Sequence, residues 1–489
     1  MAQESAARRP IFRNWLTLAG FTITLGGFFA FLLLFAIDLF AQHSNPYMGI
    51  LAYVVAPGFM FLGLVVGCVG IWMARRESRS PGGLPRRLII DLSKPAHRRT
   101  MGGFVVCAIL FLLVTAIGST RTYNYTSSTQ FCGQACHEPM KPEYTTYQQS
   151  PHARVECTAC HVGPGAKSYV ESKINGVHQL YATLVNDFDR PIKAPANLRP
   201  AQETCEQCHW PQRDSGTLDR TYHHFLADET NTPFSVRLLL KVGGGDPRRG
   251  AVGGIHWHMN LANKVEYIAA DEQRQVITWV RFTDTNGVAT EYRTPDFKDD
   301  PAKHTIRAMD CIDCHNRPAH RFQAPNDAVD AAMAAKRIDP ALPWVKSNTV
   351  FALLQKYATE TEALAKIDAS LRKAYGQAPQ VNSLVREAQH IYRNNFFPEM
   401  RSDWRAYPDN LNHKDGAGCF RCHDGLHKTA DGKRSIKASD CNSCHTILAQ
   451  GSGEQLAKLN PEGHKFFHLD SINEDFNCNS CHTGGIQKE

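Results

Sequence analysis

Three long apolar stretches open the chain, at residues 15–41, 47–74 and 101–119. An α-helix rises about 1.5 Å per residue, so each stretch is long enough to cross the roughly 30 Å hydrocarbon core of a bilayer. The first stretch is long for a signal peptide and has no small-residue cleavage site, which favours a retained anchor. The pattern therefore predicts three transmembrane helices, with residues 1–120 as a membrane anchor.

After residue 120 the apolar runs are short. Residues 275–282 and 288–293 have the pattern of strands, and Thr285-Asn286-Gly287 between them favours a hairpin turn. Residues 350–375 and 381–396 carry apolar residues at helical spacing. We expect a mainly α, loop-rich region with a small β-hairpin insertion.

The formal net charge of +7 is unevenly placed. The excess of basic residues lies within residues 1–120, and the rest of the chain is balanced. Basic residues precede the first apolar stretch and fill segment 75–99, whereas segment 42–46 has no Lys or Arg. Loops rich in Lys and Arg stay in the cytoplasm, so we expect a cytoplasmic N-terminus, with residue 121 onward in the periplasm. This distribution indicates a lipid bilayer as partner and gives no support to nucleic-acid binding.

Fourteen of the sixteen cysteines fall in seven motifs of one kind. Six motifs read C-x-x-C-H, and the first is widened to C-x-x-x-C-H. In such a motif two thiols bond to the vinyl groups of a haem, and the next histidine faces the iron. Zinc needs four ligands, and each motif offers three. We therefore expect seven covalently bound c-type haems. The thiols are Cys132, Cys136, Cys157, Cys160, Cys205, Cys208, Cys311, Cys314, Cys419, Cys422, Cys441, Cys444, Cys478 and Cys481, and the iron ligands are His137, His161, His209, His315, His423, His445 and His482.

The spacing of the motifs divides the region after the anchor into three parts. Motifs one to three are crowded together, and the fourth follows after about a hundred residues. A stretch with helical periodicity and no motif comes next, and the last three motifs follow closely. We interpret 121–325 as a four-haem module, 326–400 as a helical spacer and 401–489 as a three-haem module.

Each six-coordinate haem needs a second axial ligand, and histidine is the usual choice. In a strand, His256 and His258 would share one face, and we expect one of the pair on the fourth or the first haem. Around the last three motifs we expect three of five histidines to ligate iron. The five are His390, His413, His427, His464 and His468.

Residues 120–325 carry a more specific pattern. The runs are Cys132-GQA-Cys136-His137-EP-Met140, Tyr147-QQS-Pro151-His152, Cys157-TA-Cys160-His161-VGPG with Ser172-Lys173, and Cys311-ID-Cys314-His315-NRPA-His320. Their order resembles the NapC/NirT/NrfH family of membrane-anchored multihaem quinol dehydrogenases.

The resemblance implies roles for particular residues. Met140 stands where the family has the axial ligand of the first haem, and the wider spacing here leaves His137 as the alternative. By the same correspondence, His152 is the distal ligand of the third haem and His320 that of the second. Lys173 matches a quinol-binding lysine, but Leu180 occupies the place of the family's acid. His178, or else Asp187 or Asp189, is then the candidate proton acceptor, since a quinol releases protons with its electrons.

These observations predict a heptahaem cytochrome of the bacterial inner membrane. It would oxidise membrane quinol (menaquinol or ubiquinol) and pass electrons to a soluble periplasmic cytochrome. The resemblance suggests anaerobic or extracellular respiration as the setting. Two alternatives stay open: a non-catalytic periplasmic electron relay or store, and a multihaem reductase of a small oxyanion such as nitrite, which would need an iron with an open position.

Overall fold

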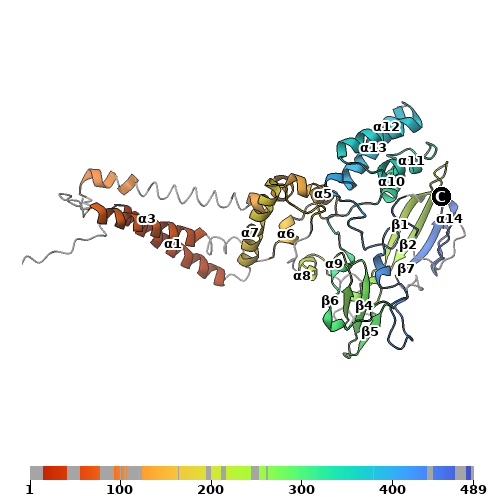
Figure 1. The fold of residues 1–489 in the computed structure, drawn as a ribbon, viewed down its shortest axis with the longest axis horizontal. Helices are drawn as coiled ribbons and strands as arrows, with labels where there is room; N and C mark the ends of the chain where they lie inside the picture. Colours follow the sequence, from red (N-terminus) through yellow and green to blue (C-terminus); the bar gives the residue numbers. More distant parts are fainter. Residues whose placement is uncertain are drawn as a thin grey trace, which may run out of the picture. The chain divides into compact units, whose positions relative to one another are not determined.

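The computed structural model describes residues 15–40, 55–77, 93–99, 101–103, 106, 121, 124–163, 165–193, 200–210, 216–243, 253–259, 263–377, 379–437, 444–468 and 481–485. The chain forms two compact units (Figure 1). The first unit contains residues 1–132 and 157–185, and the second contains 133–156 and 186–489. The thiols Cys441 and Cys478 lie outside the described residues.

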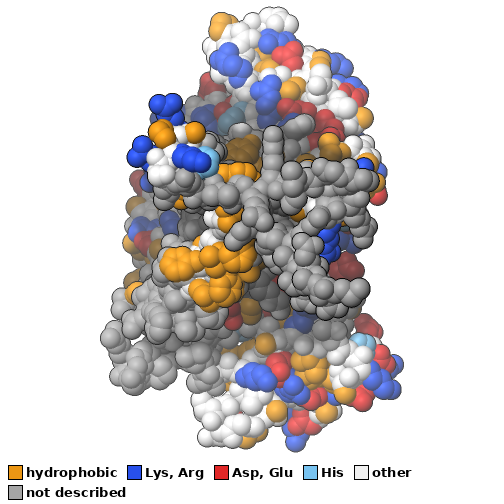
Figure 2. All heavy atoms as spheres, turned by 90° about the vertical axis from the view of Figure 1, so that its left-hand side faces the viewer, with side chains coloured by type: hydrophobic (Ala, Val, Ile, Leu, Met, Phe, Trp, Pro, Cys, Tyr) orange, Lys and Arg blue, Asp and Glu red, His pale blue; other side chains and the backbone are white. Residues whose placement is uncertain are grey.

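Two membrane-type helices, α1 (Trp15–Phe40) and α3 (Ala56–Glu77), pack together in the first unit. Glycines allow the close approach, because a Cβ on Gly20 would lie 2.3 Å from the backbone nitrogen of Gly67. Outward-facing apolar side chains such as Phe21 and Phe61 are 65% and 70% exposed, as expected of a surface that faces lipid. Figure 2 shows a group of hydrophobic side chains gathered on the face turned toward the viewer.

Two of the three predicted membrane helices are thus confirmed by length and composition. The third predicted stretch, 101–119, lies mostly outside the described residues and stays a prediction. The first unit also holds α6 (Cys157–His161) and α7 (Gly165–Leu184). The short π-helix η2 (Phe131–Ala135) contains the point of the chain, between residues 132 and 133, at which the first unit gives way to the second.

A helical core dominates the second unit. Helices α10 (Pro325–Ala334), α11 (Val345–Leu354), α12 (Glu360–Tyr375) and α13 (Pro379–Asn395) bury one continuous apolar cluster. The helix predicted at 381–396 is confirmed as α13. The prediction of a single helix over 350–375 is wrong, because the segment forms parts of two helices. Extended backbone at Gln355 ends α11. Thr359 begins α12, and its side chain accepts a hydrogen bond from the backbone N–H of Glu362.

Two antiparallel sheets accompany this core. One has the order β1-β2-β7, and the other has the order β5-β4-β3-β6. Their strands are β1 (Leu218–Phe225), β2 (Pro233–Leu240), β3 (Lys264–Ala269), β4 (Ile277–Thr283), β5 (Ala289–Arg293), β6 (Arg307–Ala308) and β7 (His445–Gly451).

The predicted hairpin is confirmed as β4–β5, but the prediction of one small hairpin understates the β content. The hairpin is half of a four-stranded sheet, and a second sheet joins β2 to β7 from the C-terminal segment. That pairing was invisible in the sequence because its strands are far apart. The short elements of this unit are α5 (His137–Gln148), α8 (Ala201–Cys205), η3 (Ile255–Met259), η4 (Pro301–Lys303), α9 (Cys311–Cys314), η5 (Pro398–Met400), η6 (Gly418–Arg421) and α14 (Glu454–Ala457).

Candidate haem-binding sites

Short helical turns present the thiols of the described C-x-x-C-H motifs. Residues three apart on such a turn lie on one face, so both thiols can reach the same porphyrin edge. The turn closes on the histidine, whose backbone N–H donates to the carbonyl of the first cysteine at 2.8 Å for His209 and His315 and at 3.0 Å for His423. No disulfide joins the cysteines that the structure describes. The local fold therefore leaves these thiols available for attachment.

A second histidine stands opposite the motif histidine at five of the seven motifs. A metal–imidazole bond is about 2 Å long, so two imidazoles on one metal have ring centres roughly 6 Å apart. The observed separations are 5.9 to 6.3 Å. Ordinary ring contacts cover the same distances, but repetition at five motifs favours ligation. The pairs are His209 with His152, His315 with His256, His423 with His258, His445 with His413, and His482 with His468.

Hydrogen bonds orient several of these rings. The Nδ1 atoms of His152 and His258 lie 3.1 and 2.9 Å from the carbonyl oxygens of Pro318 and Ile255. A carbonyl only accepts, so Nδ1 carries the proton and Nε2 keeps the lone pair that a metal needs. At the sixth motif, the Nδ1 atoms of His413 and His445 are buried without a hydrogen-bond partner among the described residues.

Burial also favours the neutral form of several motif histidines. It lowers the pKa of His315 and of His423, and the neighbouring rings of His256 and His258 lower them further. Burial likewise lowers the pKa of His445, with His413 adding to the effect. Metal ligation requires the unprotonated imidazole, so these environments fit the haem that the motifs imply.

His256 and His258 depart from the expected geometry. They lie on the 3-10 turn η3, not on a strand. Residues two apart on a 3-10 turn point about 120° away from each other, whereas on a strand they share a face. The rings consequently meet two different partners, His315 of motif four and His423 of motif five.

His320 is held next to Glu143. Its Nδ1 lies 2.9 Å from the carbonyl oxygen of Glu143, whose carboxylate pairs with Arg317 at 2.9 Å. Burial lowers the pKa of His320, which favours the unprotonated imidazole that metal ligation requires. The predicted partner motif, with His161, lies in the other compact unit, so the role of His320 on the second haem stays a prediction.

Thiols of consecutive motifs lie close together within each unit. Cys157 shares a hydrogen bond with Cys132, which raises the pKa of the Cys157 thiol. Cys205 and Cys311 form a similar pair, and the hydrogen bond lowers the pKa of Cys205 to about 7. Cys314 is near enough to Cys419 for that thiol to raise its pKa, after the larger effect of burial. Attachment points one and two are therefore neighbours, as are three, four and five.

The predicted quinol-site residues occupy α5 and α7. Met140 is half-buried on α5. The side chain of His137 lies outside the part that the structure describes. The Nζ of Lys173 donates to the carbonyl of Thr126 at 2.9 Å and lies 6.0 Å from the ring centre of Phe131. Burial lowers the pKa of Lys173, while the nearby Cys132 raises it.

His178 is exposed and lies about 140° around α7 from Lys173, because five positions separate them. Leu180, seven positions after Lys173, returns to nearly the same face. Lys173 and His178, the predicted quinol-binding lysine and proton acceptor, therefore point to different sides of this helix.

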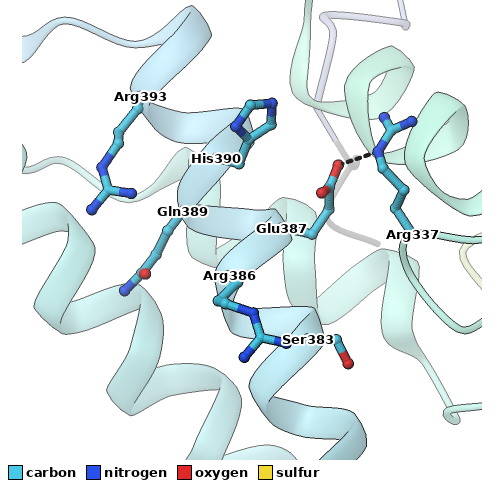
Figure 3. Close-up of a pocket in the computed structure, with 7 residues that line it drawn as sticks. All are labelled: Arg337, Ser383, Arg386, Glu387, Gln389, His390 and Arg393. Carbon is cyan, nitrogen blue, oxygen red and sulfur yellow. Dashed lines mark hydrogen bonds and ion pairs between the residues drawn. The ribbon is translucent and has the colours of Figure 1, made fainter.

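The remaining histidine candidates have other surroundings. His390 is exposed on α13, beside Arg386 and Arg393 in a shallow pocket (Figure 3). His464 is exposed. His427 is fully buried, with Nδ1 2.9 Å from Asp424 and its Nε2 without a partner among the described residues.

Sequence analysis missed Asp313, inside the fourth motif. Its buried carboxylate accepts hydrogen bonds from Tyr267 and Arg274, and its carbonyl accepts from Asn410 and Arg421. The sequence shows an acidic residue between the two cysteines of this motif, which could have drawn attention to it. Its hydrogen-bond partners could not be predicted, because they come from distant parts of the chain.

Comparison with known proteins identifies the family of this chain. A family model described as the N-terminal region of the NapC/NirT cytochrome c family matches residues 94–203. The chain is 38% identical, over 97% of its length and 96% of the relative's, to the cytochrome c-type protein ImcH of Geobacter sulfurreducens. The chain belongs to the NapC/NirT cytochrome c family.

Similarity extends to a second NapC/NirT-type protein, the cytochrome c-type protein TorC of Escherichia coli strain K12. That match is 28% identical over 39% of this chain and 49% of TorC. No solved structure matches the chain. As a member of the NapC/NirT family, the protein is a membrane-anchored, haem-containing cytochrome of electron transport.

Proposed function

We propose that the protein is a heptahaem quinol dehydrogenase of the bacterial inner membrane. It takes electrons from a membrane quinol, menaquinol or ubiquinol, and delivers them to a soluble periplasmic cytochrome. The seven haems supply the one-electron chemistry, and the chain supplies ligands, positioning and a proton path. The observation that carries the proposal is Lys173, placed beside the first haem thiol in the compact unit that also holds the two membrane helices.

Lys173 is suited to meet a quinol oxygen. Its ammonium group is partly buried, donates to one backbone carbonyl and lies beside the aromatic ring of Phe131. Oxidation of one quinol releases two electrons and two protons, so a group that accepts these protons and passes them to the bulk is needed at this place. Burial lowers the pKa of Lys173, which makes the neutral amine more accessible and favours proton exchange.

The paired histidines argue against the reductase alternative. Reduction of nitrite needs an iron with an open position, whereas at five motifs a second imidazole faces the motif histidine at a separation that suits ligation of one iron from both sides. Two strong axial ligands are typical of electron transfer. This arrangement supports an electron carrier.

The basic residues of the anchor support the proposed orientation. Lys/Arg-rich segments lie before α1 and after α3, which favours a cytoplasmic N-terminus and a periplasmic haem region. Covalent haem attachment outside the cytoplasm agrees with this topology. The similarity to the cytochrome c-type proteins ImcH and TorC supports a role in electron transport.

Reconstitution in proteoliposomes with menaquinol tests the proposal. The purified protein should be reduced by menaquinol alone, and Lys173→Met should slow that reduction by tenfold or more. Lys458→Met, which removes an exposed lysine, is the matched control and should leave the rate unchanged. Dithionite reduces every variant and shows that the haems are present.

Two results would overturn the proposal. If menaquinol reduces the haems only after another dehydrogenase is added, the protein is a relay. If Lys173→Met and Lys458→Met behave alike, the quinol site lies elsewhere.

A further inference from the structure

One short turn faces two haem motifs at once. On η3, the ring of His256 lies 6.2 Å from that of His315, with the planes 22° apart. Two residues later, the ring of His258 lies 5.9 Å from that of His423, with the planes 86° apart. Motif four belongs to the segment before the helical core, and motif five to the segment after it.

Backbone hydrogen bonds fix the position of this turn. The N–H groups of Ile255 and His256 donate to the carbonyls of Lys241 and Val242, each at 2.9 Å. The N–H of Lys241 donates in turn to the carbonyl of Cys444, in motif six, at 2.8 Å. The turn is therefore attached by its backbone to the two residues that directly follow strand β2 and, through Lys241, to the C-terminal segment.

The indole of Trp257 anchors the turn from the side. It packs on Phe282 of β4 with ring centres 5.0 Å apart and meets His258 edge-on at 5.6 Å. The same apolar cluster includes Cys422 of motif five. A rigid aromatic contact of this kind restricts the ring orientation of the neighbouring histidine.

Motifs four and five are also joined directly. The guanidinium of Arg421 donates to the carbonyl of Asp313 at 2.5 Å and to the carbonyl of Arg274 at 2.8 Å. Cys419 lies near enough to Cys314 to add to the rise in the pKa of that thiol, which burial mainly causes. The two attachment sites are neighbours for reasons that do not involve the turn.

We propose that Ile255–Met259 is a two-histidine turn that ligates two irons, His256 the fourth and His258 the fifth. Because both ligands belong to one fixed turn, the fourth and fifth cofactors are held beside each other across the junction of the two haem modules. This inference rests on the proposed function as a heptahaem cytochrome. It adds the ligands that link the four-haem module to the three-haem module.

The ring angles give the proposal a spectroscopic signature. In ferric bis-imidazole haems, nearly parallel rings give a rhombic low-spin electron paramagnetic resonance signal, whereas perpendicular rings give a strongly anisotropic one. The fourth haem should therefore belong to the first class and the fifth to the second.

The test compares three variants of the full-length, detergent-solubilised protein. His258→Met should remove one strongly anisotropic signal and raise the potential of one haem, because methionine ligation raises haem potentials. His256→Met should remove one rhombic signal. His427→Met is the control, since His427 is buried four residues after His423 and is the competing ligand for the fifth iron; it should leave the spectrum unchanged.

Two further measurements complete the experiment. Titration with dithionite follows the reduction of the haems, and the mass of the polypeptide gives the number of haems attached. Fewer than seven haems in the parent protein would overturn the proposed function. Seven haems, with an unchanged spectrum in His258→Met or the anisotropic signal lost in His427→Met, would overturn only the two-histidine turn. If His258→Met does not accumulate, His258→Gly is produced with and without imidazole. Recovery of the low-spin signal by imidazole supports ligation, and identical spectra under both conditions contradict it.

Discussion

Replacement of Asp313 by alanine should loosen the junction between motifs four and five. The carboxylate accepts from the Tyr267 hydroxyl at 2.5 Å, from the Arg274 guanidinium at 2.8 Å and from the backbone N–H of Asp310 at 2.7 Å. Its side chain is 4% exposed, so water does not replace these bonds easily. Asp310 and Asp313 also form a capping box around α9.

The magnitude follows from the groups left without a partner. Breaking a buried ion pair by removing one member costs about 3–5 kcal/mol, but Arg274 is 34% exposed and recovers part of this from water. An unsatisfied Tyr267 hydroxyl costs about 1–3 kcal/mol, and loss of a cap about 1 kcal/mol. These terms overlap, so we expect Asp313→Ala to lower the free energy of unfolding by about 4 kcal/mol. Asp313→Asn keeps one acceptor oxygen and should cost about half as much.

Urea denaturation of the solubilised holoprotein, followed by the Soret band, measures these values. Tyr267→Phe alone and combined with Asp313→Ala completes a double-mutant cycle, in which we expect a coupling of about 1–2 kcal/mol. Burial, then Asp313, raises the pKa of Tyr267 to about 12, so the tyrosine should titrate at lower pH in Asp313→Ala. The reasoning is refuted if Asp313→Ala loses less than about 1 kcal/mol, or if the two substitutions are strictly additive.

Three further predictions concern other parts of the molecule. Met140→His should lower the potential of one haem, since histidine in place of methionine lowers haem potentials; an unchanged redox titration would assign the first axial position to another residue. Burial raises the pKa of Asp415 from 3.8 to about 6, so the folded state holds its proton more tightly than the unfolded state. Stability should therefore fall as pH rises from about 4 to 6, by up to about 3 kcal/mol; Asp415→Asn should flatten this dependence, and equal slopes for both proteins in urea titrations would count against it. Ile367→Ala, at a fully buried position of the helical core, should cost about 2–5 kcal/mol while leaving the haem spectra intact, and a changed spectrum would show that this core contacts a haem.

The amino-acid sequence by itself determined the features that depend on near neighbours. A C-x-x-C-H motif is complete within one turn of backbone, so its thiols could be identified without a fold. Helices α1 and α3 follow from the length of their apolar runs, because a bilayer core needs about twenty apolar residues. The β4–β5 hairpin follows from Asn286-Gly287 between two short strands. The resemblance to the NapC/NirT family rested on the same local motifs.

Only the tertiary structure decided which histidines meet. The rings of His258 and His423 belong to segments separated by the whole helical core, and no local pattern specifies such a pairing. The alternation of His256 and His258 fits a strand, but backbone bonds to Lys241 and Val242 and the packing of Trp257 close the segment into a 3-10 turn. That change of about 120° in ring direction separates one shared face into two ligand positions. Long-range contacts, which the order of residues does not record, therefore decide how the haem sites are completed.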